Sequence, residues 1–208
     1  MLPRMHAPPS ARRRSARPHL RSLPSVRNRS FAALAAALVA AACLAGAAET
    51  AAARAPQKSG NAHAVGRLRA LEPQVLDAIN DFRRAHGLPT LRLSRALTVA
   101  AAEHSLSMAE YGYFEHSSPD GSPFWKRVAA FYPRRHGPWS VGENLVWASP
   151  GLSARKALAL WLASPPHRET LMSPAWREVG LGAVRALAGG VYRERMVTIL
   201  TADFGVRR

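Results

Sequence analysis

Three short segments of this sequence contain the side-chain types that a metal or acid–base site needs. His116 precedes a Pro119-Asp120-Gly121 run, whose residue types favour a tight turn. Glu143 lies in a later apolar stretch, and His167 follows two prolines. A carboxylate and two imidazoles that converge from separate segments can bind a divalent metal or move protons. The sequence therefore suggests a site formed by His116, Glu143 and His167.

Each candidate also has a structural interpretation. Glu143 is flanked by apolar residues, and a buried carboxylate needs a partner, so it can instead hold the backbone together through hydrogen bonds. His167 falls in the first turn of an expected short helix, where the dipole favours a neutral ring that can bind metal. A hydrogen-bonded surface histidine is the alternative there and at His116. His104 lies on the apolar face of a helix and is expected to be a hydrogen-bonded core residue.

Three further residues are expected to support the cleft. Asp120 is most simply a turn residue. Asn144 follows the glutamate directly and can orient the neighbouring segments through its amide. Ser164 is expected to cap the short helix that contains His167, with a proline at the first helical position. No His-Glu-x-x-His motif is present, which argues against one large class of zinc proteases.

The net charge of +16 is concentrated in part at the N-terminus. Eight of the 29 basic residues precede residue 31, and the remaining 21 face 13 acidic residues along the rest of the chain. These later charges are scattered without a basic stripe. We therefore expect a mildly basic, solvated surface and no nucleic-acid binding, with attraction to an anionic cell envelope left open.

The N-terminal segment has the pattern of an export signal. A basic region precedes the apolar run 31–48, and Ala45-Gly46-Ala47 suits cleavage, so residues 1–47 are expected to be a signal peptide. A retained membrane anchor and lipid attachment at Cys43 are the alternatives. After processing we expect no stable transmembrane span, and a secreted, extracellular or cell-envelope-associated protein. Residues 48–67 are expected to form a flexible linker and residues 68–208 one folded domain.

The expected elements put helices first and strands last. Apolar spacing predicts helices over 75–86 and from Ser94 to Tyr111, then shorter ones over 123–130, 152–163 and 165–172. A strand is expected over 141–148, and two more over 178–186 and 191–204, joined by a hairpin turn at Gly189-Gly190. This order indicates an α+β domain.

The order of short motifs from about residue 73 to residue 205 resembles the CAP superfamily, which comprises cysteine-rich secretory, antigen 5 and pathogenesis-related 1 proteins. It is most similar to the bacterial secreted branch of SCP-like extracellular proteins. The motifs are Asn80-x-x-Arg83, Leu88-Pro89-x-Leu91, Ala101-x-x-His104-Ser105-x-x-Met108, Phe114-Glu115-His116-Ser117, Gly142-Glu143-Asn144, Trp161-x-x-Ser164-Pro165-Pro166-His167-Arg168, Val179-Gly180-Leu181-Gly182 and Phe204-Gly205.

The resemblance implies a three-layer α-β-α sandwich with a mainly antiparallel sheet and a cleft over it. It also implies a divalent-metal site of two histidines and two acids, which map here to His116, His167 and Glu143. The second acid would fall at Ser164, where this sequence has none. The remaining set can still bind zinc, with water in the fourth position.

Two functions follow as hypotheses. The first is a non-enzymatic extracellular binding module whose cleft takes an apolar or cell-envelope ligand, such as a lipid, or a protein. The second is a metal-dependent hydrolase that uses His116, Glu143 and His167 to activate water. No general base beside the metal can be identified, which favours the binding module over the enzyme.

Overall fold

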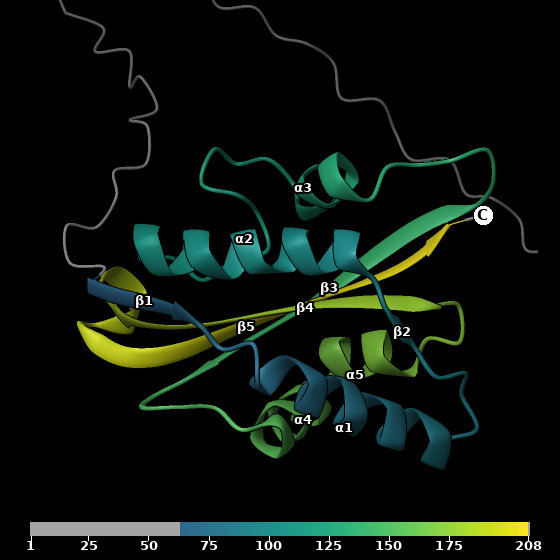
Figure 1. Ribbon diagram of the computed structural model, residues 1–208, viewed down its shortest axis with the longest axis horizontal. Coiled ribbons are helices and arrows are strands. Elements are labelled where there is room, and N and C mark those ends of the chain that lie inside the picture. Colours follow the sequence, from purple (N-terminus) through teal and green to yellow (C-terminus); the bar gives the residue numbers. More distant parts are fainter. Residues whose placement is uncertain (1–62, 208) are drawn as a thin grey trace, which may run out of the picture. The chain divides into compact units, whose positions relative to one another are not determined.

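The computed structural model describes residues 63–207, which form one five-stranded sheet with helices on both faces (Figure 1). The helices are α1 (Leu71–Ala85), α2 (Arg95–Tyr111), α3 (Phe124–Phe131), α4 (Ala154–Ala163), α5 (Pro165–Met172) and the 3₁₀ helix η1 (Gly190–Tyr192). The strands are β1 (His63–Arg67), β2 (Arg92–Leu93), β3 (Trp139–Ala148), β4 (Glu178–Ala188) and β5 (Arg195–Arg207). The expected α+β sandwich is confirmed.

The sheet is mainly antiparallel. Its strand order is β1-β4-β5-β3, and the short β2 adds to β4 in parallel. β3 pairs with β5 along its whole length, which sets Glu143 directly opposite Asp203. Directly opposed residues of an antiparallel pair have Cβ atoms roughly 4.5–5.5 Å apart, so these two side chains share one face of the sheet.

Helices α2 and α3 cover one face of the sheet, and α1, α4 and α5 cover the other (Figure 1). α2 lies directly on β4 because two glycines leave room for its backbone. A Cβ atom at Gly180 would lie 2.0 Å from the Leu97 carbonyl carbon, and one at Gly182 would lie 2.2 Å from the Ala102 nitrogen. Any side chain at either glycine would push the helix off the sheet.

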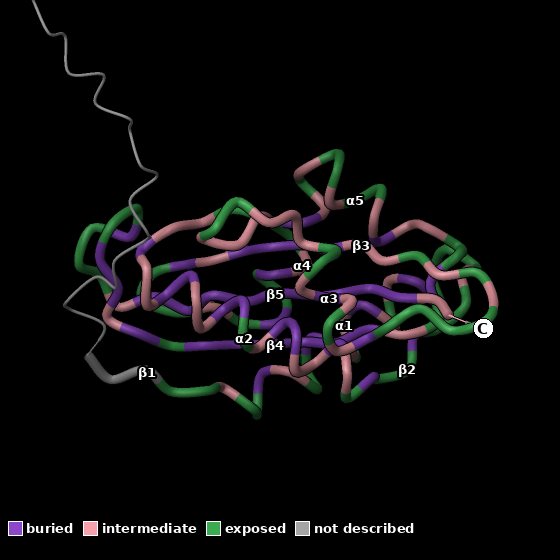
Figure 2. Tube along the Cα trace, turned by 90° about the horizontal axis from the view of Figure 1, so that it is seen from above, coloured by how far each residue is buried: buried purple, intermediate pink, exposed green. Residues whose placement is uncertain are grey.

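The core consists of three apolar clusters, one on the α1–α4–α5 face and two beneath α2 and α3. The central strands β4 and β5 are buried along most of their length, as the purple segments of Figure 2 show. All members of these clusters lie between residues 68 and 206. The described domain therefore contains the packing partners of its own core.

Two polar residues of α1 fix the segment that follows it. The Asn80 side chain donates to the Leu91 carbonyl at 3.0 Å and accepts from the Leu91 amide at 2.8 Å. Arg83 is fully buried and donates to the carbonyls of Pro89 at 2.8 Å and Leu171 at 2.7 Å. This explains the Asn-x-x-Arg motif as a clamp on backbone groups that would otherwise be buried without partners.

Two expectations about the chain's boundaries and turns need correction. The domain does not begin at Leu68, because residues 63–67 of the expected linker form β1 on β4. The connection from β4 to β5 is not a two-residue hairpin but a longer turn that contains η1. Gly190 has φ +60°, and a Cβ there would lie 2.1 Å from the Gly112 carbonyl oxygen. The glycines therefore allow close packing on the end of α2.

The expected signal peptide, the lipid attachment at Cys43 and the first part of the linker lie outside the described residues. None of the described helices, which lie between residues 71 and 192, combines the length and apolar composition that a bilayer crossing requires.

Candidate functional site

Glu143 of β3 is the centre of a compact polar cluster on the α2–α3 side of the sheet. Its side chain has no solvent exposure. One carboxylate oxygen, Oε1, lies 2.8 Å from His116 Nδ1, and the other, Oε2, accepts a hydrogen bond from the Arg127 guanidinium of α3. Arg127 also donates to the His116 carbonyl at 3.3 Å and to Ser118 Oγ at 3.4 Å. The buried carboxylate thus has both a cationic partner and an imidazole partner.

The bond to Glu143 fixes the orientation of His116. Since a carboxylate only accepts hydrogen bonds, Nδ1 carries the proton in this contact, and in the neutral ring Nε2 is left as the free acceptor. The His116 side chain is half exposed, and its ring lies 6.4 Å from that of His167, centroid to centroid. The buried carboxylate of Glu143 therefore sets the orientation of a half-exposed imidazole ring.

Asp203 is a second acid of this cluster, and sequence reasoning missed it. It lies on β5 opposite Glu143 and is fully buried, with no donor hydrogen-bonded to either carboxyl oxygen among the described residues. Burial, together with the charge of Glu143, raises the pKa of Asp203 well above its usual value, and Arg127 opposes this shift. The buried position beside Glu143 therefore favours the neutral form of Asp203.

His104 of α2 lines the same cluster from the other side. It is 1% exposed, and its Nε2 lies 2.9 Å from the Glu115 carbonyl and 3.9 Å from Glu143 Oε2. Burial lowers the pKa of His104 to about 4, although the charge of Glu143 opposes the shift. His104 is thus the neutral, hydrogen-bonded core histidine that the helical pattern predicts.

His167 lies beside β3, the strand at the edge of the sheet. Its carbonyl accepts a hydrogen bond from the Asn144 amide at 2.9 Å, so Asn144 ties α5 to β3. Burial lowers the pKa of His167, with His116 as a smaller cause. A neutral imidazole therefore faces His116, while Glu143 and Asn144, adjacent in β3, each position one of the two histidine segments.

The other supporting residues have simpler roles. Asp120 accepts hydrogen bonds from the Ser122 amide at 2.9 Å and from the Ser122 hydroxyl at 3.0 Å, a pattern typical of an aspartate that stabilises a turn. Ser164 separates α4 from α5 and occupies the N-cap position of α5, but its side chain makes no capping hydrogen bond. It lines an apolar groove instead.

That groove adjoins His167 and has a volume of about 240 Å³. It is lined chiefly by apolar side chains, with Ser164 and His167 as the polar members; the others are Phe114, Leu145, Val146, Trp147, Leu160 and Trp161. Leu160 remains 43% exposed. The volume of the groove is smaller than the roughly 300–1,000 Å³ of a complete ligand pocket, so the groove suits one apolar chain or ring of a larger ligand.

The side chains around Glu143 meet the needs of a metal ion only in part. Among residues 63–207, no three His, Cys, Asp or Glu side chains are placed to hold an ion together. Both oxygens of Glu143 are engaged, by His116 and by Arg127. The residues that fit a divalent cation are the two imidazoles, His116 and His167. Glu143 would be the carboxylate behind a ligand histidine, an arrangement common at metal sites.

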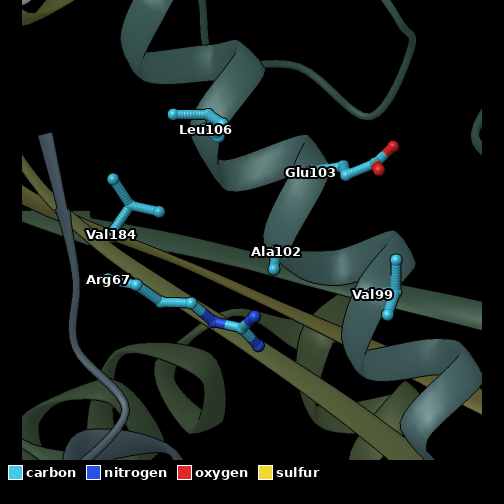
Figure 3. Close-up of a pocket in the computed structure, with 6 residues that line it drawn as sticks. All are labelled: Arg67, Val99, Ala102, Glu103, Leu106 and Val184. Carbon is cyan, nitrogen blue, oxygen red and sulfur yellow. The ribbon is translucent and has the colours of Figure 1, made fainter.

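A separate hollow of about 400 Å³ lies between α2 and the β1–β4 edge of the sheet, with Arg67 and Val184 on one side and Ala102 and Leu106 of α2 on the other (Figure 3). Arg67 is paired with Glu72 at 3.0 Å. No residue of the His116–Glu143 cluster lines this hollow, so it is not part of the candidate site.

Curated relatives match part of the chain. It is 29% identical over 114 residues to the uncharacterized membrane protein YlbC of Bacillus subtilis, covering 55% of this chain and 32% of that protein. It is 30% identical over 88 residues to the human Golgi-associated plant pathogenesis-related protein 1, covering 42% of this chain and 47% of that protein. The matches thus span less than half of each relative.

Solved structures share the fold. An extracellular protein with an SCP domain from Bacillus anthracis aligns with a TM-score of 0.51 and 27% identity, over 67% of this chain and 41% of that chain. An outer surface protein of Borrelia burgdorferi aligns with a TM-score of 0.51 and 18% identity, over 64% and 90% of the two chains. The first of these is an extracellular protein and the second a surface protein.

The model of the cysteine-rich secretory protein family, CAP, matches residues 76–204, which include the whole polar cluster and both histidine segments. By this match over more than half of its length, the chain belongs to the CAP family.

Proposed function

We propose that this domain is an extracellular binding module whose cleft, formed by His116, His167 and the apolar groove beside β3, takes an amphipathic cell-envelope ligand. The observation that supports this most is the state of Glu143. Its side chain is shielded from solvent and bonded to Arg127 and His116. A general base must reach the water or substrate that it deprotonates. These contacts support a role for Glu143 in orienting His116 rather than in deprotonating water.

The groove supplies the apolar part of the site. Phe114, Leu160 and Trp161 line it, and His167 stands at one side with a polar ring. An amphipathic ligand would place its chain in the groove and its polar head near the imidazoles. A divalent cation held by His116 and His167 would add a positive charge at the head-group position; this extends the proposal and is not required by it.

The test uses residues 50–208, which contain every described element, and saturated fatty acids of increasing length as probes. Trp147 and Trp161 line the groove and report binding by fluorescence. Each methylene buried contributes about 0.8 kcal/mol. Affinity should therefore rise roughly fourfold per added methylene until the groove is filled. Titrations with zinc and with a chelator would show whether the cation contributes.

A variant and a matched control locate the binding. Leu160→Ser removes an exposed apolar side chain from the groove, whereas Val191→Ser removes one of similar exposure elsewhere, 52% against 43%. Weaker binding in the first variant alone supports the proposal. Equal binding by both variants, or no chain-length dependence, would overturn it. Zinc-dependent hydrolysis of a short-chain ester that disappears in both Glu143→Gln and His167→Ala would favour the hydrolase instead.

A further inference from the structure

Five arginines that are scattered in the sequence gather at one end of the sheet. They come from β2, the start of α2, the loop between α3 and β3, and the end of β5, all of which lie at the right of Figure 1 near the C-terminus. This arginine cluster consists of Arg92, Arg95, Arg134, Arg135 and Arg207. All but Arg207 are exposed, and Arg207 is half-buried. These charges are scattered along the sequence without a basic stripe, and the fold brings five of them together.

Contacts join the members of the cluster. Arg95 and Arg207 line one hollow of about 510 Å³ together with Glu178. The Arg207 guanidinium lies 3.8 Å from the centroid of the Tyr132 ring and donates to the Pro133 carbonyl at 3.4 Å, directly before Arg134. The cluster is thus built around a buried aromatic ring, which holds Arg207 in place.

The positive charge of the cluster is largely uncompensated. Glu178 is the one acid that lines the hollow. It accepts a hydrogen bond from the Tyr132 hydroxyl and lies 3.8 Å from Arg92, whose side chain remains 81% exposed. One carboxylate can neutralise only one of five guanidinium groups. The remaining charges produce a positive field that attracts anions.

An exposed apolar side chain lies within the cluster. Leu93 is 56% exposed, the largest exposure among the large apolar residues of the described domain, and it stands between Arg92 and Ser94-Arg95. Phe131, which is half-buried, lines the same hollow. Soluble polyanions offer nothing for an apolar side chain to enter. A phospholipid bilayer offers both anionic head groups and an apolar layer beneath them.

We propose that the arginine cluster is a docking surface for an anionic phospholipid membrane, with the arginines on the phosphate groups and Leu93 inserted below them. The surface is distinct from the His116–His167 cleft, so the two can be occupied independently. Docking would hold the cleft near the membrane from which an amphipathic ligand could enter it.

Co-sedimentation with vesicles tests the proposal. Residues 50–208 are used, because the apolar run 31–48 would bind membranes by itself. Vesicles of phosphatidylcholine alone are compared with vesicles that contain roughly one third phosphatidylglycerol. We expect strong binding only to the anionic vesicles, and its loss in about 0.5 M salt. Replacing three arginines in R95Q/R134Q/R135Q should weaken binding about a hundredfold. Leu93→Ser should weaken it severalfold at the same net charge.

The matched control removes three charges elsewhere on the surface, in R155Q/K156Q/R185Q, and should bind nearly as well as the unaltered domain. Circular dichroism and thermal unfolding verify that each variant is folded. Equal weakening in the two triple variants would overturn the proposal, because net charge alone would then explain the binding. Arginine-dependent binding to heparin or duplex DNA without binding to vesicles would also overturn it, in favour of a soluble polyanion.

Discussion

Two groups of charged side chains in this domain differ in burial and in how far their charges are compensated. The cluster around Glu143 is buried, and its charges are matched: Arg127 pairs with Glu143, while burial disfavours the charged forms of Asp203 and His104. The arginine cluster is exposed, and Glu178 compensates only part of its charge. Buried charge must be paired because desolvation is costly, whereas exposed charge is solvated and can remain unpaired.

The difference separates stability from recognition. Altering the buried cluster should change the free energy of unfolding and its pH dependence, with His116 orientation as the functional consequence. Altering the exposed cluster should change binding and leave the fold intact.

Arg127→Met should be the most damaging substitution. It leaves Glu143 buried without its cation, and breaking a buried pair in this way costs about 3–5 kcal/mol. Urea unfolding measures the loss. Lys126→Met, at the exposed neighbouring position on α3, is the control and should change stability by no more than about 0.5 kcal/mol. Similar losses in both variants would show that α3 is merely sensitive to substitution.

His104 should make the domain sensitive to acid. Its pKa is lowered from 6.5 to about 4. Between these pH values the ring is protonated in the unfolded chain but stays neutral in the folded protein. The stability is therefore fully present above pH 6.5 and is lost as the pH falls through about 4, by about 3 kcal/mol. Glu143, Arg127 and His116 all influence this ring.

His104→Gln keeps a donor for the Glu115 carbonyl but does not titrate. The free energy of unfolding of this variant should fall less between about pH 6.5 and pH 4 than that of the unaltered domain. Parallel pH profiles for the two proteins would contradict the assignment of His104 as a buried neutral residue.

Asp203→Asn should have an effect that grows with pH. The pKa of Asp203 is higher in the folded protein than in the unfolded chain, where it is near 3.8. The contribution of Asp203 to the free energy of unfolding is therefore fully present below pH 3.8 and declines as the pH rises toward the folded-state pKa. Asparagine keeps nearly the same side-chain shape beside Glu143 and never ionises. The variant should gain stability relative to the unaltered domain above about pH 4, measured by urea unfolding across pH. A uniform loss at every pH would mean that folding does not raise the pKa of Asp203.

Arg92→Gln and Arg95→Gln should have the smallest effect on folding. Both side chains are exposed, so each substitution should change the free energy of unfolding by no more than about 0.5 kcal/mol. Thermal unfolding tests this. A loss of 2 kcal/mol or more, by the scale of buried substitutions, would show that the arginine cluster also holds the domain together.

Local pattern predicted most of the fold. The helix over 165–172 was predicted with its observed bounds, and the others were predicted within a few residues, because apolar spacing and helix-ending glycines act within a single turn. β1 was missed because its residues gain their partner, β4, from more than a hundred positions away. The turn at Gly189-Gly190 was misjudged because its shape depends on packing against Gly112.

The same limit applies to the candidate site. His116, Glu143 and His167 could be named from the sequence because they lie in short motifs. Asp203 had a weak signal, a single acid within an apolar strand, and such a residue needs a partner. Nothing local indicated that the partner was Glu143, because that depends on the register of β3 on β5.

The family, the order of helices and strands, and the candidate residues of the cleft can be read from the amino-acid sequence alone. Which charged side chains meet depends on the tertiary fold. The fold brings Arg127 into a hydrogen bond with Glu143 and sets Asp203 opposite Glu143 in the sheet. It also brings five arginines that are distant in sequence to one end of the sheet. Secondary structure arises from interactions between near neighbours in the chain, whereas electrostatic partners are chosen by the packing of distant segments, which sequence spacing does not encode.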